Sequence, residues 1–366
     1  MNNSVLNNHS KIFSLIVIFT FVLVLFISTG FEKKTEGEVA LKTGEPMQEK
    51  ADLLAGIPNA VAYSGFRNGQ HPDRGNGAKN PSDAEIIEDL EILTRDSNFR
   101  LIRMYDSQEN TEAVLRIIKE KKFDMKVLLG IWLDAEFSNH EGCAWLTEPI
   151  PEEALAKNKL KNQAEVARGL RLANEYPEII VALNVGNEAI VDWTDHKVPV
   201  ETVIEYVKTV KQAINQPVTV AEVYDAWIKH CAELVEAVDF ISVHTYPVWE
   251  GKTIDEGFPY AMQCIKSVKD VYPDKPMVIT ETGWATIASE FGERASEENQ
   301  KRYCTEFNEW AISNNVTTFI FEAFDEDWKG DPANPIGAEK HWGLFNVDRT
   351  AKLMMQELYP DLKPAE

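Results

Sequence analysis

The 366 residues are 44% hydrophobic and 26% charged, a balance typical of a soluble globular protein with a large core, which excludes a chain that is disordered throughout. Acidic side chains outnumber basic ones by 59 to 37, and the formal net charge of −22 argues against a nucleic-acid partner, because phosphates would be repelled. The 4 cysteines form no CxxC pair, so buried thiols or one disulfide are expected rather than a zinc site.

The first predicted element is an apolar segment near the amino terminus. Residues 12–29 carry no charge, with a lysine before them and three charged residues shortly after them. This run is long for the apolar part of a cleaved signal peptide and long enough to span a bilayer. We therefore expect residues 1–30 to be a signal peptide or a membrane anchor. The protein would then be exported, either tethered to the membrane or secreted or periplasmic.

A polar linker is expected at residues 31–53, and a single folded domain at 54–366. In this domain short apolar runs alternate with amphipathic helical patterns, which is typical of a parallel sheet covered by helices. The predicted strands are 60–63, 101–105, 126–131, 179–185, 218–223, 240–244, 277–280 and 318–321. Helices are predicted at 84–93, 111–119, 163–175, 200–214, 226–235, 260–271 and 297–313. Together they predict an α/β fold, a (β/α)8 barrel; the alternative, a doubly wound open sheet, lacks its glycine-rich fingerprint.

Two glutamates stand directly at the ends of predicted strands, where a structural position would favour an apolar or small residue. Glu188 ends the motif GNE after the fourth run, and Glu281 begins the motif ETGW after the seventh. In such barrels the reacting groups lie at the carboxyl ends of the strands. Two facing carboxylates can cleave a glycosidic bond, with retention of configuration if about 5–5.5 Å separates them. The structural alternative for either glutamate is a salt-bridged or capping carboxylate.

These motifs resemble those of glycoside hydrolase family seventeen, in the clan whose catalytic glutamates follow barrel strands four and seven. The family's β-1,3-glucanases carry GNE at the acid/base and a motif like ETGW at the nucleophile. A further match covers DEDWK at 325–329, Glu339 and GLF at 343–345, with the order agreeing over about residues 57–350. The resemblance implies that Glu188 is the acid/base and Glu281 the nucleophile. It also implies a supporting ion network of Glu326, Lys329 and Glu339, for which a surface salt-bridge cluster is the alternative.

The function implied by the resemblance is a retaining glycosidase that cleaves β-1,3-glucan without a cofactor. Ala285 stands where plant members usually have proline, and an insertion around 141–145 follows the third strand, so we expect a bacterial-type member. Endo and exo action stay open. A membrane-tethered glucanosyltransferase that uses the same glutamates is the alternative function, whereas a carbohydrate-binding protein on an inactive barrel is disfavoured because both glutamates are retained. Since the 7 histidines form no closely spaced pair on a strand, no metal site is expected. The expected state is a monomer.

Several polar and aromatic residues are predicted to bind the substrate. They are Asn187, Tyr246, Trp284, Tyr63, Trp132, Glu326, Lys329 and Glu339. Asn187 would hydrogen-bond the sugar 2-hydroxyl, and Tyr246 would donate a hydrogen bond to the nucleophile. Trp284 and Trp132 would stack an indole face on a sugar ring, although ordinary packing is the alternative for each aromatic residue. His244, at the end of the sixth run, is interpreted as a hydrogen-bonded structural imidazole.

Overall fold

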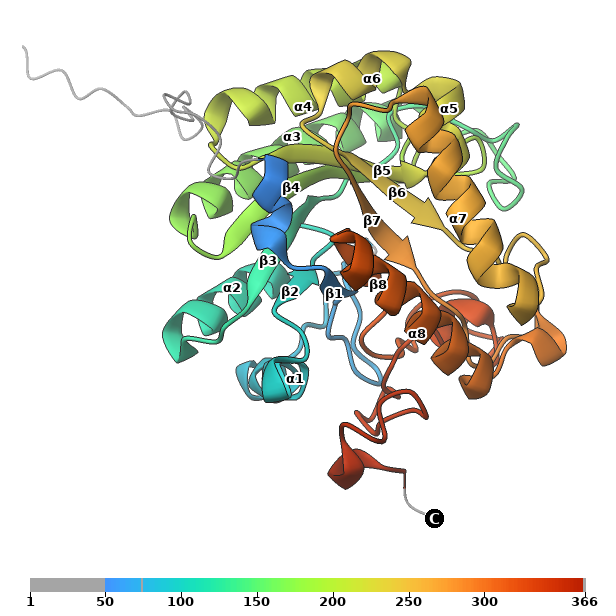
Figure 1. The fold of residues 1–366 in the computed structure, drawn as a ribbon. Helices are drawn as coiled ribbons and strands as arrows, with labels where there is room; N and C mark the ends of the chain where they lie inside the picture. The colour runs from blue at the N-terminus through green and yellow to red at the C-terminus, as the bar shows by residue number, and fades with distance from the viewer. Residues whose placement is uncertain (1–49, 74, 365–366) are drawn as a thin grey trace, which may run out of the picture. The chain divides into compact units, whose positions relative to one another are not determined.

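The computed structural model describes residues 50–73 and 75–364. Eight parallel strands pair in chain order and close on themselves, so the predicted (β/α)8 barrel is confirmed (Figure 1). The strands are β1 (Asn59–Ala62), β2 (Leu101–Arg103), β3 (Lys126–Ile131), β4 (Ile180–Asn187), β5 (Val218–Val223), β6 (Ile241–Thr245), β7 (Met277–Thr282) and β8 (Thr318–Ile320). The ranges predicted for the third and fifth strands coincide with β3 and β5.

Helices surround the barrel (Figure 1). The α-helices are α1 (Asp83–Thr94), α2 (Glu109–Lys121), α3 (Glu152–Glu175), α4 (Val200–Ala213), α5 (Tyr224–His230), α6 (Ala232–Ala237), α7 (Ile254–Val271) and α8 (Glu297–Asn314). The 3-10 helices are η1 (Lys50–Gly56), η2 (Arg95–Ser97), η3 (Gly292–Arg294), η4 (Ala338–Lys340) and η5 (Pro360–Leu362).

Most predicted helix ranges agree with the structure to within two residues, and the larger differences concern three predicted helices. Helix α7 begins at residue 254 rather than 260, because Thr253 and Glu256 form a capping box and Pro259 is accommodated inside the helix. Helix α3 begins at residue 152 rather than 163, since its first turns are largely polar and carry little apolar periodicity. The predicted helix 226–235 is divided into α5 and α6 at Cys231, whose backbone is not helical.

The barrel interior changes from apolar to charged along the strands. Leu54 of η1 packs against an apolar layer inside the barrel that includes Leu128 and Phe240, and this layer fills the amino-terminal end. Farther along the strands, Arg103 and His244 are fully buried. Burying such groups costs free energy unless they are paired, so they mark the carboxyl end of the barrel as the candidate site.

Some expectations fall outside the part of the chain that can be described. The predicted segment 1–30 and most of the linker 31–53 lie there; in residues 50–73 and 75–364, no helix is long and apolar enough to cross a membrane.

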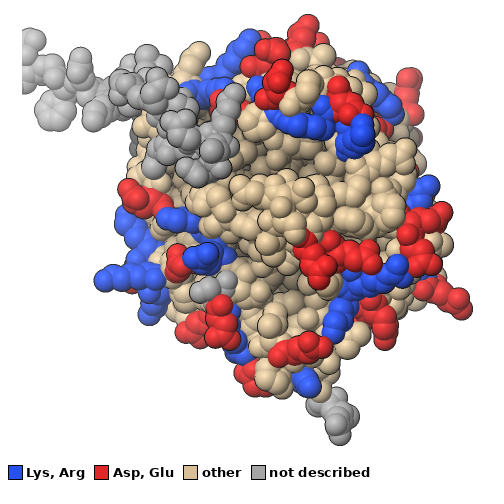
Figure 2. Space-filling model, viewed as in Figure 1, with Lys and Arg blue, Asp and Glu red and all other residues tan. Residues whose placement is uncertain are grey.

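All 4 cysteines are buried free thiols, so the disulfide alternative is not formed. On the face drawn in Figure 2, basic and acidic side chains are interspersed around the edge, and an uncharged band crosses the centre.

Candidate active site

A tight turn at the end of β4 positions Glu188. Gly186 has a φ of +83° and Glu188 a φ of +48°, both in the left-handed region that glycine adopts freely and that costs free energy for glutamate. The Glu188 N–H donates to the carbonyl of Ala221 at 2.8 Å, which anchors the turn to β5. The carboxylate of Glu188 is therefore held at the carboxyl end of the barrel by a strained but hydrogen-bonded backbone.

The carboxylate of Glu281, on β7, accepts hydrogen bonds at both oxygens. Arg103 Nη1 lies 2.5 Å and the hydroxyl of Tyr105 2.9 Å from Glu281 Oε1. The hydroxyl of Tyr246 donates to Oε2 at 2.6 Å, the contact that the sequence predicted for this tyrosine. Glu281 is only 5% exposed, so these three donors replace water around the carboxylate.

His244, on β6, lies between the two glutamates. Its Nδ1 is 2.8 Å from Glu188 Oε1 and 3.5 Å from Glu281 Oε2. Its Nε2 faces Arg103 Nη1 at 3.3 Å. Because a guanidinium can only donate, we assign Nε2 as the acceptor, and Nδ1 then carries the hydrogen directed at Glu188. His244 is thus a hydrogen-bonded imidazole that joins the two candidate catalytic residues.

The environment of Glu281 favours its ionised form. Burial raises the pKa of its carboxyl, and a cationic His244 would lower it, but the tautomer assigned above is neutral. With His244 neutral, the charge of Arg103 and the hydrogen bonds from Tyr246 and Tyr105 remain as the causes that favour the carboxylate; when His244 is also cationic, the pKa of Glu281 lies below its ordinary value of 4.5. Glu281 is therefore a carboxylate at neutral pH.

A metal ion does not suit this site. Within residues 50–73 and 75–364, Glu188, His244 and Glu281 are the group of acidic and imidazole side chains whose ligand atoms converge, all within 4.8 Å of one another. Arg103 already contacts both Glu281 and His244, so a divalent cation bound by these three side chains would be repelled by the guanidinium. The donor set instead suits proton transfer and nucleophilic attack.

Asn187 and Trp132 lie on the Glu188 side of the site. Asn187 Oδ1 accepts a hydrogen bond from Arg103 Nη2 at 2.5 Å, which fixes the amide so that its Nδ2 hydrogens are directed elsewhere. The backbone oxygen of Asn187 lies 2.9 Å from His196 Nε2. The half-buried indole of Trp132 lies over the His196 ring, with centroids 4.6 Å apart. Both predicted residues therefore adjoin the Glu188 turn.

The predicted ion network follows β8. Lys329 Nζ lies 2.8 Å from Glu326 Oε2 and 2.7 Å from Glu322 Oε2, and both glutamates are 1% exposed. Burial raises the pKa of Glu322 well above its ordinary value. The positive charge of Lys329 opposes this rise, and the negative charge of Glu326 adds to it. Lys329 thus supplies one positive charge to two buried carboxyl groups, and burial favours the protonated form of Glu322.

Glu339, in η4, stands apart from this pair of carboxylates. Its side chain reaches solvent, yet the surrounding protein desolvates it and raises its pKa; the charge of Lys329 opposes this rise, and those of Glu188 and Glu281 add to it. Glu339 therefore lies near enough to the candidate catalytic pair to be influenced by its charge.

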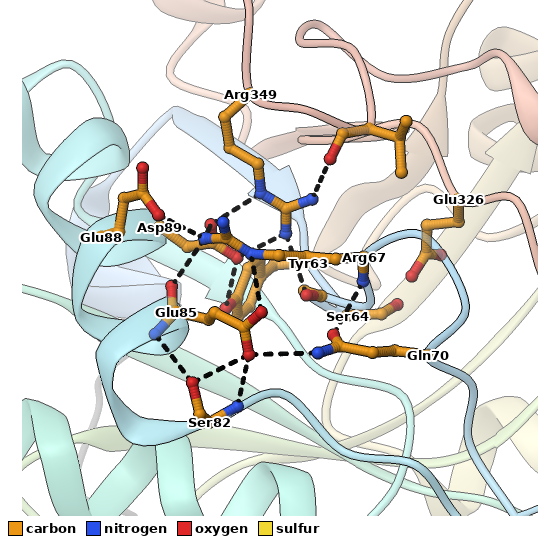
Figure 3. A network of polar contacts seen from close by, with 12 residues as sticks. Tyr63, Ser64, Arg67, Gln70, Ser82, Glu85, Glu88, Asp89, Glu326 and Arg349 are labelled. Carbon is orange, nitrogen blue, oxygen red and sulfur yellow. Dashed lines mark hydrogen bonds and ion pairs between the residues drawn. The ribbon is translucent and has the colours of Figure 1, made fainter.

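Tyr63 belongs to a different network (Figure 3). It is 1% exposed, and its hydroxyl donates to Asp89 Oδ2 at 3.2 Å. Arg349 also binds Asp89, at 2.7 and 2.8 Å, and Arg67 binds it at 2.9 Å. Tyr63 thus ties β1 to α1 rather than approaching Glu281, contrary to the prediction that it binds substrate.

Trp284 is placed differently from the prediction as well. The indole is 0% exposed, and its Nε1 donates to the backbone oxygen of Arg294 at 2.7 Å. Its ring packs against Tyr303, with centroids 5.3 Å apart. A fully buried indole has no face free for a sugar, so the expected stacking role is corrected to a packing role behind β7.

Sequence reasoning missed the residues that surround Glu281 and Glu188 from inside the barrel. Arg103 and Tyr105 both come from the run LIRMY at 101–105, where an arginine inside an apolar strand was the available signal. Glu222, on β5, is 0% exposed and accepts a hydrogen bond from the Ile190 N–H at 3.0 Å, directly after the Glu188 turn. Burial, and then the charge of Glu188, raise the pKa of Glu222 well above its ordinary value.

Comparisons with known proteins show the family to which the chain belongs. Residues 60–343 match the BtgE/BtgC glycoside hydrolase domain family. A glucan 1,3-beta-glucosidase of Arthroderma benhamiae is 27% identical over 289 residues, covering 74% of this chain and 83% of that protein. An Aspergillus niger protein assigned as a glucan endo-1,3-beta-glucosidase is 29% identical over 296 residues; the match covers 74% of this chain but spans only 40% of that protein.

Two solved structures share the fold. An endo-laminarinase from Formosa superposes with a TM-score of 0.71 at 28% identity, covering 82% of this chain and 86% of the laminarinase. A glycoside hydrolase family 17 beta-1,3-glucanosyltransferase from Rhizomucor miehei superposes with a TM-score of 0.61 at 23% identity, covering 81% of this chain and 96% of the other. At that lower identity the second likeness shows the fold alone.

Proposed function

Since the chain belongs to the BtgE/BtgC glycoside hydrolase domain family, we propose that it cleaves β-1,3-linked glucan through a covalent glycosyl-enzyme intermediate. The observation that carries this proposal is the convergence of Glu188 and Glu281, whose nearest carboxylate oxygens lie within 4.8 Å. Retaining glycosidases separate their carboxyl groups by about 5–5.5 Å, and inverting ones by about 6.5–9.5 Å, to admit a water molecule. The short separation supports retention.

The environments of the two glutamates support different roles. Glu281 is held ionised by Arg103 and two tyrosines, so it serves as the nucleophile that attacks the anomeric carbon. Glu188 is more accessible, with 15% of its side chain exposed, and it donates a proton to the leaving oxygen as the glycosidic bond breaks. Water or a sugar hydroxyl then attacks the anomeric carbon of the glycosyl ester, Glu188 takes up its proton, and the bond from that carbon to Glu281 breaks, which releases the carboxylate.

Arg103 also positions a substrate contact. Because Asn187 Oδ1 accepts from Arg103 Nη2, its Nδ2 group is oriented as a donor. We propose that this amide binds the sugar 2-hydroxyl, a hydrogen bond that strengthens toward the oxocarbenium-like transition state. The same arginine thereby couples the orientation of Asn187 to the charge of Glu281.

The choice of β-1,3-glucan is supported by the names of the relatives, a glucan 1,3-beta-glucosidase and an endo-laminarinase, at 27% and 28% identity. Within that substrate class, we propose that the chain is a bacterial-type member of glycoside hydrolase family seventeen. Glucanosyl transfer is a second candidate function, because the same intermediate can pass to a sugar. The exposed indoles of Trp145 and Trp193, in the loops that adjoin the Glu188 turn, favour transfer because they could bind an acceptor sugar.

The decisive experiment analyses the products formed from a laminari-oligosaccharide series by the full chain and by Glu281→Gln. We expect shorter products from the native protein and a loss of roughly a thousandfold or more in the variant. Products longer than the substrate would identify transfer. An unchanged series with the native protein would contradict the β-1,3-glucan assignment.

We further propose that the protein is exported and acts as a monomer tethered by its apolar amino-terminal segment. The support is the uncharged run at residues 12–29. The tether predicts that the chain sediments with membranes after an alkaline carbonate wash and that removal of residues 1–30 releases it. Recovery of the unaltered chain in the soluble fraction would contradict the tether, and light scattering would reveal an oligomer.

A further inference from the structure

Two loops at the carboxyl end of the barrel are joined into one unit. They are the β3–α3 loop, residues 132–151, and the β4–α4 loop, residues 188–199. Asn139 is 7% exposed, and its Nδ2 donates to the backbone oxygens of Asp192 and Thr194, both at 2.8 Å. The N–H of Phe137 donates to the Lys197 oxygen at 3.0 Å. These bonds fix the insertion after β3 against the loop that begins at Glu188.

Two indoles project from this unit into solvent. Trp145 is 59% and Trp193 44% exposed, and their ring centroids lie 6.2 Å apart at an interplanar angle of 51°. Trp145 Nε1 donates to Asp195 Oδ2 at 3.1 Å. This hydrogen bond is made at the edge of the indole. It therefore orients the ring without covering either of its faces.

The indole pair is connected to the acid/base turn by a chain of polar contacts. Asp195 Oδ1 lies 3.0 Å from His196 Nδ1, and His196 Nε2 lies 2.9 Å from the backbone oxygen of Asn187, the residue before Glu188. Trp132 packs on the His196 ring. The position of the indoles is therefore tied to the position of Glu188 rather than to that of Glu281.

We propose that Trp145 and Trp193 form a binding subsite for a glucosyl residue on the leaving-group side of the scissile bond, which also receives the acceptor sugar in transfer. This inference rests on the proposed glucan activity. The acid/base protonates the oxygen that departs with this sugar, so the sugar must lie beside the Glu188 turn. The apolar face of a glucopyranose suits stacking on an indole, and a neutral sugar is not repelled by a chain of net charge −22.

The test compares two substrates in the full chain. Laminaripentaose has a sugar leaving group, whereas p-nitrophenyl β-laminaribioside has an aryl leaving group. For Trp145→Ala and Trp193→Ala, we expect the ratio of kcat/KM for the first substrate to that for the second to fall about fivefold. Transfer products formed with added laminaribiose should fall in parallel. Trp145→Phe, which keeps a ring, should retain most of the ratio.

The control is Leu160→Ala, which truncates an apolar side chain that is 67% exposed on α3, outside both loops, and should leave the ratio unchanged. A ratio within twofold of the native value in the folded double alanine variant would overturn the subsite, as would equal losses on both substrates. If the native chain cleaves neither substrate, the proposed function fails, and calorimetric binding of laminaripentaose then decides the subsite. Weaker binding by the double variant would support it, and equal binding would overturn it.

Discussion

Arg103 makes contacts from β2 to Glu281, Asn187 and His244, and each contact has a separate consequence for the chemistry. The contact with Glu281 favours a carboxylate, that with Asn187 orients an amide, and that with His244 sets the imidazole tautomer. A guanidinium stays charged at all relevant pH values, so the charge that Arg103 contributes does not change with pH. These contacts support the nucleophile role that we propose for Glu281.

Tyr246→Phe removes the hydrogen bond to Glu281 Oε2, which is 2.6 Å long. Because this bond stabilises the ionised form, its loss should raise the pKa of the nucleophile, move the acidic limb of kcat/KM to higher pH and lower kcat roughly tenfold or more. The measurement is a pH profile between pH 3 and 8. Tyr63→Phe is the matched control, because its hydroxyl binds Asp89; an equal shift in both variants would contradict the assignment.

Asp106 follows Tyr105 and carries a free-energy cost at neutral pH. Burial and the negative charge of Glu165 raise the pKa of Asp106 from 3.8 to about 6. A raised pKa means that the folded state binds the proton more tightly, so the contribution of Asp106 to stability is most favourable below pH 3.8 and is lost as pH rises through about 6. The ionised group then costs up to about 3 kcal/mol.

Asp106→Asn should therefore raise the free energy of unfolding at pH 8, by up to about 3 kcal/mol, and change it little at pH 4. The amide oxygen can still accept from the Gln108 N–H and the Thr111 hydroxyl, which now donate to Asp106 Oδ1. Denaturant titrations at the two pH values measure the effect. A change of equal size at both would show that the carboxylate is not destabilising.

Individual site residues could be predicted from their positions at the ends of strands, but not from the side chains that surround them in the fold. Glu188, Glu281 and Tyr246 follow strands directly and converge as predicted. Trp284 also follows a strand, but the side-chain direction at the end of β7 turns it behind the strand against Tyr303, which position alone does not reveal. Arg103 was missed because its partners are 84 or more residues away in sequence.

The network around Asp89 joins elements from the two ends of the domain (Figure 3). Asp89 is 0% exposed on α1, and Arg349 is 2% exposed in the segment that follows β8. The guanidinium also donates to the backbone oxygen of Gly65 at 2.9 Å. This buried pair holds the β1–α1 loop against the carboxyl-terminal segment at the seam where β1 pairs with β8.

Arg349→Met is expected to lower the free energy of unfolding by about 3–5 kcal/mol, because it leaves a buried carboxylate without its main partner. Arg95→Met is the matched control: its ion pair with Asp361 is 2.6 Å long and also links the α1 region to the carboxyl-terminal segment, but Asp361 is exposed to solvent, so the loss should be much smaller. Equal losses in the two variants, measured by denaturant unfolding, would contradict the role of burial.

Element boundaries could be predicted where apolar periodicity was strong. Strands β3 and β5 are short, largely apolar runs, and their limits match the predicted ones. Helix α7 begins before the predicted start at residue 260: the Thr253 and Glu256 capping box marks its first turn, and the helix continues through Pro259. The polar first turns of α3 offered no such periodic signal.

At the scale of the whole molecule, barrel closure brings together residues that are 93 positions apart (281 minus 188). The alternation of apolar runs and helices was enough to predict this closure. The same repeat does not predict the loops. The insertion after β3 contacts the β4–α4 loop through hydrogen bonds of Asn139, and such bonds produce no periodic pattern in the sequence. The site is thus predictable to the extent that it lies on strands.

We propose Glu281 as the nucleophile of a retaining reaction. The most direct test incubates the full chain with 2-deoxy-2-fluoro-β-laminaribiosyl fluoride and maps the modified peptide by mass spectrometry. We predict a single glycosyl ester on Glu281, absent from Glu281→Gln. An adduct on another residue, or a first product of inverted anomeric configuration, would contradict the account.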